Sequence, residues 1–219
     1  MFVGHYGPAL AGKAIAATVP LWLLFLAVQL FDVAWSIFIL TGIEHVRLIP
    51  GFMALSPLDL YYMPYTHGLI TALVWSIAFA ALYMAAVWGR GRITAFLIVT
   101  LAVFSHWVLD FLVHTRDLPL IDNRMKVGLG LWNFPQIALP LEAAVLVGGM
   151  LLYVAWTKPK NLAGRIAPWA VLAFLAAIHA YALVQPLPKS AQEFAATALA
   201  SFLILPLLGL ILDRTREAK

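Results

Sequence analysis

Long uninterrupted apolar runs are the feature that most limits how this chain can fold. A helix needs about 20 mostly apolar residues to cross a hydrocarbon core of about 30 Å. We predict six spans, at Leu21–Ile43, Thr66–Trp88, Ile93–Val113, Gln136–Trp156, Ala167–Gln185 and Phe194–Leu212. The runs are continuously apolar and do not alternate, so they predict membrane-crossing helices and not the strands of a membrane barrel.

Composition excludes a water-soluble fold. Of the 219 residues, 63% are hydrophobic and 11% are charged, whereas a soluble domain has about 25% charged residues. We therefore predict one all-α transmembrane domain over residues 1–219, with the lipid bilayer as its solvent. The absence of cysteine excludes disulfides, thiolate zinc sites and cysteine nucleophiles.

The basic residues predict the orientation of the spans. Nine lie on one predicted face: Lys13, Arg90, Arg92, Lys158, Lys160, Arg165, Arg214, Arg216 and Lys219. Five lie on the other: Arg47, Arg116, Arg124, Lys126 and Lys189. The positive-inside rule makes the first face cytoplasmic, with both termini on it. The net charge of +4 then reflects attraction to anionic headgroups at span ends and requires no nucleic acid.

The connections between spans differ between the two faces. Cytoplasmic connections such as Gly89–Arg92 and Thr157–Ile166 are short and basic. The outer connections Glu44–Tyr65 and His114–Pro135 are longer and hold most of the remaining charge, so we expect function to concentrate there.

The segment Ala9–Val19 leaves two interpretations open. It is apolar but too short to cross, and Pro20 ends it, which favours a re-entrant or interfacial helix. Alternatively, the first crossing is Ala9–Phe31.

Ionisable side chains inside the spans are the candidate functional residues, because each costs a few kcal/mol unless it is paired or coordinated. They are Asp32, His67, His106, Asp110, Glu142 and His179. His67, His106, Asp110 and Glu142 lie at a shared level near the outer face, and Asp32 lies somewhat deeper. We expect these five to line one cavity. For His179 we expect a hydrogen bond to a neighbouring helix.

The sharpest local pattern is a polar stripe on the third span. At 100° per residue, His106, Asp110 and His114 lie at about 0°, 40° and 80°, and Asp117 at about 20° if the helix persists. A histidine and a carboxylate at i and i+4 can bind one divalent ion, as helical ligand pairs do in metallohydrolases. The alternative is a structural hydrogen-bond network. Glu142 is either a proton carrier or an ion-pair partner of Arg124 or Lys126.

Several landmarks occur in an order that resembles a known family. They are Gly4-His5, Leu30-Phe31-Asp32, Tyr65-Thr66-His67-Gly68-Leu69, the helix carrying His106 and Asp110, and the turn Leu118-Pro119. The set resembles the YdjM-like membrane-bound metal-dependent hydrolases, which are distantly similar to zinc-dependent phospholipase C. The resemblance covers about residues 5–142 and leaves the two spans within 167–212 without a role.

The resemblance implies five metal ligands: His5, Asp32, His67, His106 and Asp110. Two positions depart from the family pattern, because Ala34 replaces its second acid and Gly68 replaces its serine. Glu44 and His45 are candidate substitutes for the missing ligand. A ligand role for His5 conflicts with a cytoplasmic N-terminus unless Ala9–Val19 is re-entrant.

These observations predict a metal-dependent hydrolase in a bacterial inner membrane, acting on a phosphoester or related ester of a lipid at the non-cytoplasmic face. The nitrogen and oxygen ligands suit Zn²⁺, with Mn²⁺ or Fe²⁺ as alternatives. Glu142, Asp117 or His114 would act as general base or acid. Arg124 or Lys126 would meet an anionic headgroup. The alternative function is non-enzymatic: a small transporter, or a haem protein using His106 and another buried histidine.

The predicted orientation can be tested by cysteine labelling, because the chain has no cysteine of its own. In intact cells, a membrane-impermeant thiol reagent should modify Asp122→Cys and leave Lys160→Cys unmodified. The reverse pattern would show that the orientation is inverted.

Overall fold

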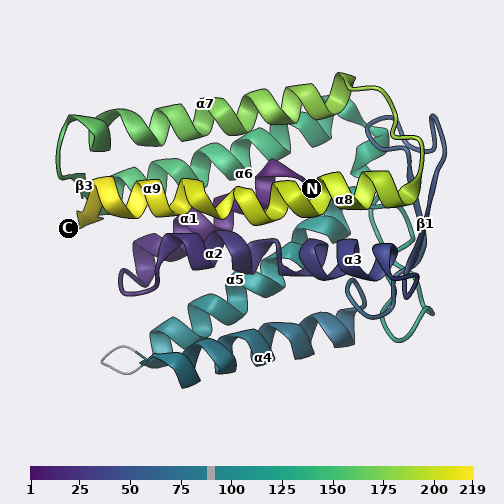
Figure 1. Ribbon diagram of the computed structural model, residues 1–219, viewed down its shortest axis with the longest axis horizontal. Coiled ribbons are helices and arrows are strands. Elements are labelled where there is room, and N and C mark those ends of the chain that lie inside the picture. The colour runs from purple at the N-terminus through teal and green to yellow at the C-terminus, as the bar shows by residue number, and fades with distance from the viewer. Residues whose placement is uncertain (88–91) are drawn as a thin grey trace.

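Helices aligned along one axis form a bundle in the computed structural model, which describes residues 1–87 and 92–219 (Figure 1). The helices are α1 (Tyr6–Ile15), α2 (Leu21–Val28), α3 (Leu30–Leu40), α4 (Leu69–Ala86), α5 (Arg92–Val113), α6 (Pro135–Trp156), α7 (Leu162–Val184), α8 (Ala191–Ile204) and α9 (Pro206–Thr215). The short elements are η1 (Val3–His5), η2 (Leu131–Asn133) and the antiparallel strand pairs β1 (His45–Leu48) with β2 (Leu58–Tyr62) and β3 (Thr157–Pro159) with β4 (Arg216–Ala218). The two strand pairs lie at opposite ends of the bundle.

The predicted fold class is confirmed. Among the described residues, five helical segments are long and apolar enough to cross a membrane, namely α4, α5, α6, α7 and the stretch Ala191–Thr215 that contains α8 and α9. The pair α2 and α3 is bent by 52° and makes the number of spans six if the pair crosses as one. The predicted end of the second span at Trp88, and most of the connection Gly89–Arg92 with Arg90, lie outside the described residues.

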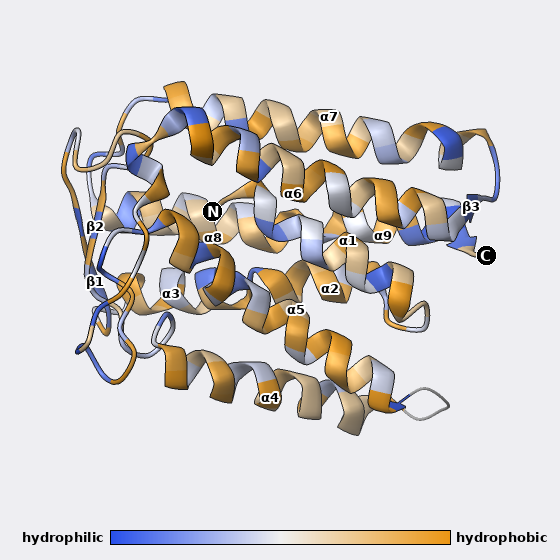
Figure 2. Cartoon of the chain, turned by 180° about the vertical axis from the view of Figure 1, so that it is seen from behind, coloured by the Kyte–Doolittle hydropathy of each residue, from blue (hydrophilic) through white to orange (hydrophobic). Residues whose placement is uncertain are grey.

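The outer surface of the bundle is apolar, as an integral membrane protein requires. Figure 2 shows hydrophobic residues along the helices and hydrophilic residues gathered towards both ends. Large side chains such as Ile93 and Val184 are 78% and 79% exposed. A soluble protein would not leave this many large apolar side chains facing water, so lipid is the solvent that the surface fits.

Helix α7 begins at Leu162, five residues before the predicted span, because the side chain of Asn161 caps it by accepting from the Gly164 amide at 3.0 Å. Pro168 inside α7 has no amide proton to give the Gly164 carbonyl. The Arg216 guanidinium donates to that carbonyl at 2.7 Å instead. The C-terminal strand β4 therefore supplies the hydrogen bond that Pro168 cannot give in the first turns of α7.

The N-terminal segment crosses only part of the bundle. Helix α1 begins in the interior and runs towards the end where the C-terminus lies; the chain then turns through residues 16–20, and α2 runs back (Figure 1). The ten residues of α1 are about 15 Å long, half of a hydrocarbon core. The re-entrant interpretation of Ala9–Val19 fits this path, and a first crossing at Ala9–Phe31 does not. Met1 is buried beside Asp110, so the expectation of an N-terminus at the cytoplasmic face is wrong for this residue.

Helix α1 reaches the interior through a close backbone contact with α6. A Cβ on Gly149 would lie 2.3 Å from the Gly7 carbonyl oxygen, and a Cβ on Gly7 would lie 2.3 Å from the Val145 carbonyl oxygen. Only glycine permits this approach, because the opposing atoms belong to the backbone and cannot rotate away.

Substituting Gly149 should therefore destabilise the bundle. We expect Gly149→Val to lower the free energy of unfolding by about 1–3 kcal/mol or more, because it overpacks a backbone contact. Gly148→Val is the matched control, since its Cβ would meet nothing within 4 Å. Thermal unfolding in detergent measures both variants, and equal melting temperatures would contradict the packing described here.

Candidate metal centre

Histidine and aspartate side chains from five parts of the chain converge in the interior. His5 ends η1, Asp32 lies on α3, His67 precedes α4, His106 and Asp110 lie on α5, and His114 directly follows α5. All are buried except Asp32, which is partly buried. We call these six residues the His/Asp cluster.

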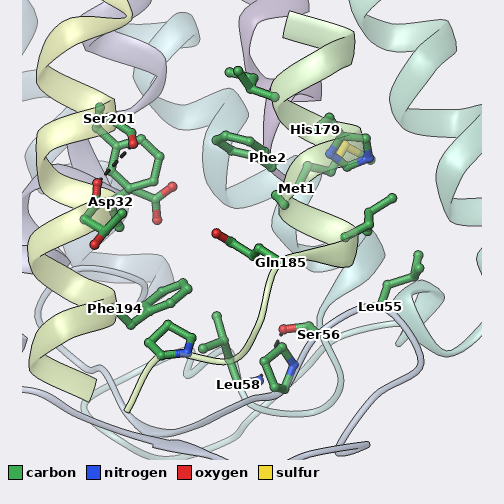
Figure 3. Close-up of a pocket in the computed structure, with 18 of the residues that line it drawn as sticks. Met1, Phe2, Asp32, Leu55, Ser56, Leu58, His179, Gln185, Phe194 and Ser201 are labelled. Carbon is green, nitrogen blue, oxygen red and sulfur yellow. Dashed lines mark hydrogen bonds between the residues drawn. The ribbon is translucent and has the colours of Figure 1, made fainter. Parts of the chain in front are cut away.

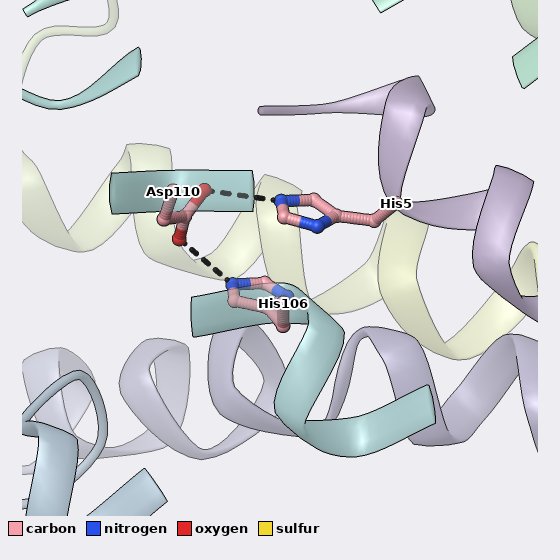
Figure 4. A group of neighbouring side chains, drawn as sticks. All are labelled: His5, His106 and Asp110. Atoms are coloured by element: carbon pink, nitrogen blue, oxygen red, sulfur yellow. Dashed lines mark hydrogen bonds and ion pairs between the residues drawn. The ribbon is translucent and has the colours of Figure 1, made fainter. Parts of the chain in front are cut away.

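Asp110 is the hub of the His/Asp cluster. Its Oδ1 lies 3.1 Å from Nε2 of His5, and its Oδ2 lies 3.0 Å from Nε2 of His106 (Figure 4). The same Oδ2 lies 3.7 Å from Nε2 of both His67 and His114. The Met1 amine also pairs with Oδ1. One carboxylate therefore faces four imidazoles.

Asp32 supplies a second carboxylate, which faces the same Nε2 atoms of two of these rings. Its Oδ1 lies 3.5 Å from Nε2 of His67 and 3.6 Å from Nε2 of His106. His67 and His106 therefore each face two carboxylates. The bend between α2 and α3 precedes Asp32 by only a few residues, and the side chain enters the bundle just beyond it.

The helical spacing explains why α5 and the residue directly after it supply three members. His106, Asp110 and His114 follow one another at intervals of four residues, which places them on one face of a helix. The predicted stripe is therefore present, and the chain leaves the helix after Val113. Asp117, which the stripe would include only if the helix continued, comes from the following turn and approaches His114 at 3.1 Å.

The Nδ1 atoms of three histidines are held by partners outside the cluster. Nδ1 of His106 donates to the Val28 carbonyl at 2.6 Å, and Nδ1 of His114 donates to Asp117 at 3.1 Å. Nδ1 of His67 lies 2.8 Å from the Thr66 hydroxyl, whose proton goes to Glu44 at 2.6 Å. The Thr66 oxygen is thus free to accept from His67. Each ring consequently carries its proton on Nδ1.

A neutral imidazole that is protonated at Nδ1 has a lone pair at Nε2. In His67, His106 and His114 this lone pair faces carboxylate oxygens at 3.0 to 3.7 Å. Nε2 of His106 has no hydrogen-bond partner among the described residues. Lone pairs and carboxylates repel each other in an apolar interior unless a proton or a metal cation lies between them.

Two ligand sets have a spacing that suits a metal ion. His5, His106 and Asp110 form one set, and Asp32, His67 and His106 form the other; within each set the ligand atoms lie within 4.8 Å of one another. Ligands at about 2.0–2.2 Å from one tetrahedral Zn²⁺ are about 3.3 Å apart. Separations of 3.0 to 3.6 Å in these sets are close to that value. The buried His/Asp groups could therefore bind metal.

Glu44 accepts the hydrogen bond of the Thr66 hydroxyl, which in turn contacts Nδ1 of His67. Its carboxylate accepts from the amides of Tyr65 and Thr66 at 2.8 and 3.0 Å and from the Thr66 hydroxyl. Burial raises the pKa of Glu44, and these hydrogen bonds oppose the rise. Glu44 thus orients His67 and does not replace a ligand. His45, the other proposed substitute, is exposed and stacks on Tyr61.

A cavity of about 720 Å³ opens beside the cluster (Figure 3). Its wall includes Asp32, His67, Asp110, His114 and Glu142. It also includes two residues that we did not assign to the site from sequence, His179 and Lys189. The cluster is therefore accessible to a small molecule or to part of a larger one.

Glu142 and His179 form a second polar group on the cavity wall. Glu142 accepts from the amides of Phe2 and Gly4 at 2.6 and 3.1 Å, and its other oxygen lies 3.8 Å from Nε2 of His179. Neither ring nitrogen of His179 has a hydrogen-bond partner among the described residues, so the hydrogen bond predicted for it is not found. His179 faces the cavity instead.

The predicted headgroup-binding residues lie elsewhere. Arg124 is exposed at the turn that follows Ile121, and Lys126 donates to the Tyr61 carbonyl at 2.6 Å. Partial burial lowers the pKa of Lys126. Neither residue belongs to the cavity wall, nor does either pair with Glu142 in the described part of the chain. A role for them at the headgroup stays a prediction, and among the described lysines and arginines Lys189 is the one on this cavity wall.

Comparison with known proteins gives no relative: no family model, curated protein or solved structure matches the chain. The assignment of the cluster therefore depends on its own geometry.

Asp110→Asn tests the hub. The substitution keeps the shape of the side chain and removes the charge that a cation requires, so it should weaken Zn²⁺ binding by more than the roughly 10–100-fold that loss of an outer-shell partner costs. Metal content after purification, measured by elemental analysis, should fall accordingly. Asp122→Asn is the control, because Asp122 is exposed and its φ of 51° suits asparagine. Full metal content in Asp110→Asn would show that the hub is not a ligand.

Proposed function

We propose that this protein is a membrane-embedded, metal-dependent hydrolase that acts on a phosphoester or related ester of a lipid at the non-cytoplasmic face. The observation that carries the proposal is the convergence of three Nε2 lone pairs on the buried carboxylate of Asp110 and the partly buried carboxylate of Asp32, beside an open cavity. The ordered landmarks that resemble the YdjM-like hydrolases support the same proposal independently of this geometry.

The residues present fit a divalent transition-metal ion. His5, Asp32, His67, His106 and Asp110 would hold it, and His114 lies within reach of the same hub. Imidazole and carboxylate ligands without thiolate suit Zn²⁺, with Mn²⁺ or Fe²⁺ as alternatives. Such an ion would supply a water of lowered pKa and Lewis acidity at the ester oxygen.

The other polar residues on the cavity wall would move protons or orient the ligands. Asp117 holds the His114 ring by its Nδ1 and thus acts as a positioning residue. Glu142 and His179 lie on the same cavity, away from the ligands, where they would carry a proton to a leaving group. Their mutual distance of 3.8 Å would shorten to a hydrogen bond with a small rotation of either side chain.

The hydrogen bonds to the Nδ1 atoms of the histidines would hold the ligand atoms in place before a metal ion binds. Val28, Thr66 with Glu44, and Asp117 each hold one imidazole with its lone pair directed inwards. Partners of this kind fix the tautomer and orientation of metal-ligating histidines. Because they come from three different parts of the chain, the ligand geometry would depend on the fold and not on any single helix.

Metal removal tests the proposal. The purified protein should be colourless, contain stoichiometric metal and hydrolyse a chromogenic phosphodiester such as bis(p-nitrophenyl) phosphate. Treatment with a strong nitrogen or oxygen chelator should abolish the activity, and Zn²⁺ or Mn²⁺ should restore it. Asp110→Asn should remain inactive after the same addition, which separates catalysis by this cluster from catalysis by free metal.

Activity that persists after elemental analysis shows metal to be absent would eliminate the proposed mechanism. A red preparation with a Soret band would instead identify a haem protein.

A further inference from the structure

The cavity beside the His/Asp cluster extends between two helices, α7 and α8, from which the proposed chemistry uses only His179. On α7 the wall includes Phe174, Ile178 and Ala182, and on α8 it includes Phe194, Ala198, Phe202 and, just beyond its end, Leu205. Within each helix these positions recur every three or four residues, so they form one apolar stripe on each helix. Polar residues also line the cavity beside the stripes, namely His179 on α7 and Thr197 and Ser201 on α8.

The two helices are held apart by their packing. Helix α8 packs against α3, whereas α7 packs against α6 and α9. The cavity therefore lies between α7 and α8, which are joined at the outer end by a segment containing Gln185 and Lys189 (Figure 3). Both residues line the cavity at that end.

Charged and apolar groups share the length of the cavity. Near the α7–α8 connection the wall contains Ser56, Gln185, Lys189 and Glu193, together with apolar residues such as Leu58 and Leu187. The cluster lies deeper, and Figure 3 shows Asp32 near Ser201. The wall deeper in the bundle also contains Phe174, Phe202 and Leu205. From Glu193 to Leu205 a helix rises about 18 Å, so the cavity extends over more than half the thickness of a hydrocarbon core of about 30 Å. A cavity of this length, with charged groups on one part of its wall and large apolar side chains on the rest, matches a molecule with a headgroup and an acyl chain.

The apolar part of the cavity is open on its lipid-facing side. Phe174 on α7 and Ile204 on α8 both line it, yet they are 49% and 60% exposed. These residues lie well inside spans that are apolar enough to cross a membrane. At that depth the molecules outside the protein are lipid acyl chains, so the cavity is continuous with the bilayer itself.

We propose that the gap between α7 and α8 binds a phospholipid that enters sideways from the surrounding bilayer. Its acyl chain lies between the two apolar stripes, and its phosphate lies at the His/Asp cluster, with Lys189 on the wall of the same cavity. The positive charge of Lys189 favours an anionic headgroup. Placement of the phosphate at the cluster rests on the proposed function, whereas insertion of the acyl chain between α7 and α8 does not.

Photolabelling tests acyl-chain insertion directly. The full chain is reconstituted in nanodiscs of phosphatidylethanolamine and phosphatidylglycerol with a trace of phosphatidic acid that carries a diazirine in its acyl chain. After irradiation, mass spectrometry should locate the label on the cavity stripes of α7 and α8. The chelated protein should give the same pattern, because the acyl chain does not contact the cluster.

Filling the gap should block the label. Ala198→Trp on α8 and Ala182→Trp on α7 place a large ring in the cavity from opposite walls, and each should reduce labelling of the stripes several-fold. The matched controls are Ala200→Trp and Ala180→Trp, which lie on the same helices at exposed positions outside the cavity wall. Both controls should label as the unmodified chain does.

Two blocking variants on different helices keep the test decisive if one of them fails to fold, which size-exclusion chromatography and thermal unfolding would show. Label distributed evenly over the lipid-facing surface, or equal labelling in the folded blocking and control variants, would overturn the proposal. Labelling confined to the stripes in a protein without metal-dependent hydrolysis would support lipid binding while removing the proposed enzymatic function.

Discussion

The buried carboxylate of Asp110 is the interaction on which the rest of the structure depends. Four imidazoles approach it, and a second carboxylate, Asp32, faces two of the same rings. Removing one partner of a buried ion pair lowers the free energy of unfolding by about 3–5 kcal/mol, because the other charge is left without a partner. The elements that carry these groups, from η1 to α5, therefore have few alternative arrangements in which every charge keeps a partner. Hydrophobic packing brings the helices together, and the cluster selects how they are placed.

Hydrogen bonds from neighbouring backbone and side-chain atoms orient the imidazole rings of the cluster. Each of three histidines donates its Nδ1 proton to an acceptor outside the cluster, so the direction of its Nε2 lone pair is fixed before any ligand binds. The Glu44–Thr66–His67 chain is the longest of these connections, since it joins an outer loop to the interior. A site built in this way is rigid on the side of the ligands and open on the side of the cavity.

Hydropathy predicted most of the fold, because apolar runs long enough to cross a bilayer rarely form any structure other than a transmembrane helix. Helical period and the cost of buried charge likewise selected His106 and Asp110. The relay through Thr66 could not be predicted, because it depends on how the Glu44–Tyr65 connection folds back on itself. The position of Arg124 and Lys126 away from the cavity wall has the same cause, and no local pattern marks His179 or Lys189 as cavity residues. Loop conformation and the packing of distant helices decide these positions, and neither is encoded in a short sequence window.

The contact between Gly7 and Gly149 has a consequence for the way the protein is assembled. Helix α1 is synthesised early, but the backbone groove that accepts it belongs to α6, about 140 residues later in the chain. Until α6 has entered the membrane, α1 is too short to span and has no partner against which to bury its close-packed face. His5 would thus join its companions late in biogenesis, after the other cluster residues are already in the bilayer. Translation order alone would keep the centre incomplete until α6, the third helix long enough to span the membrane among the described residues, is in place.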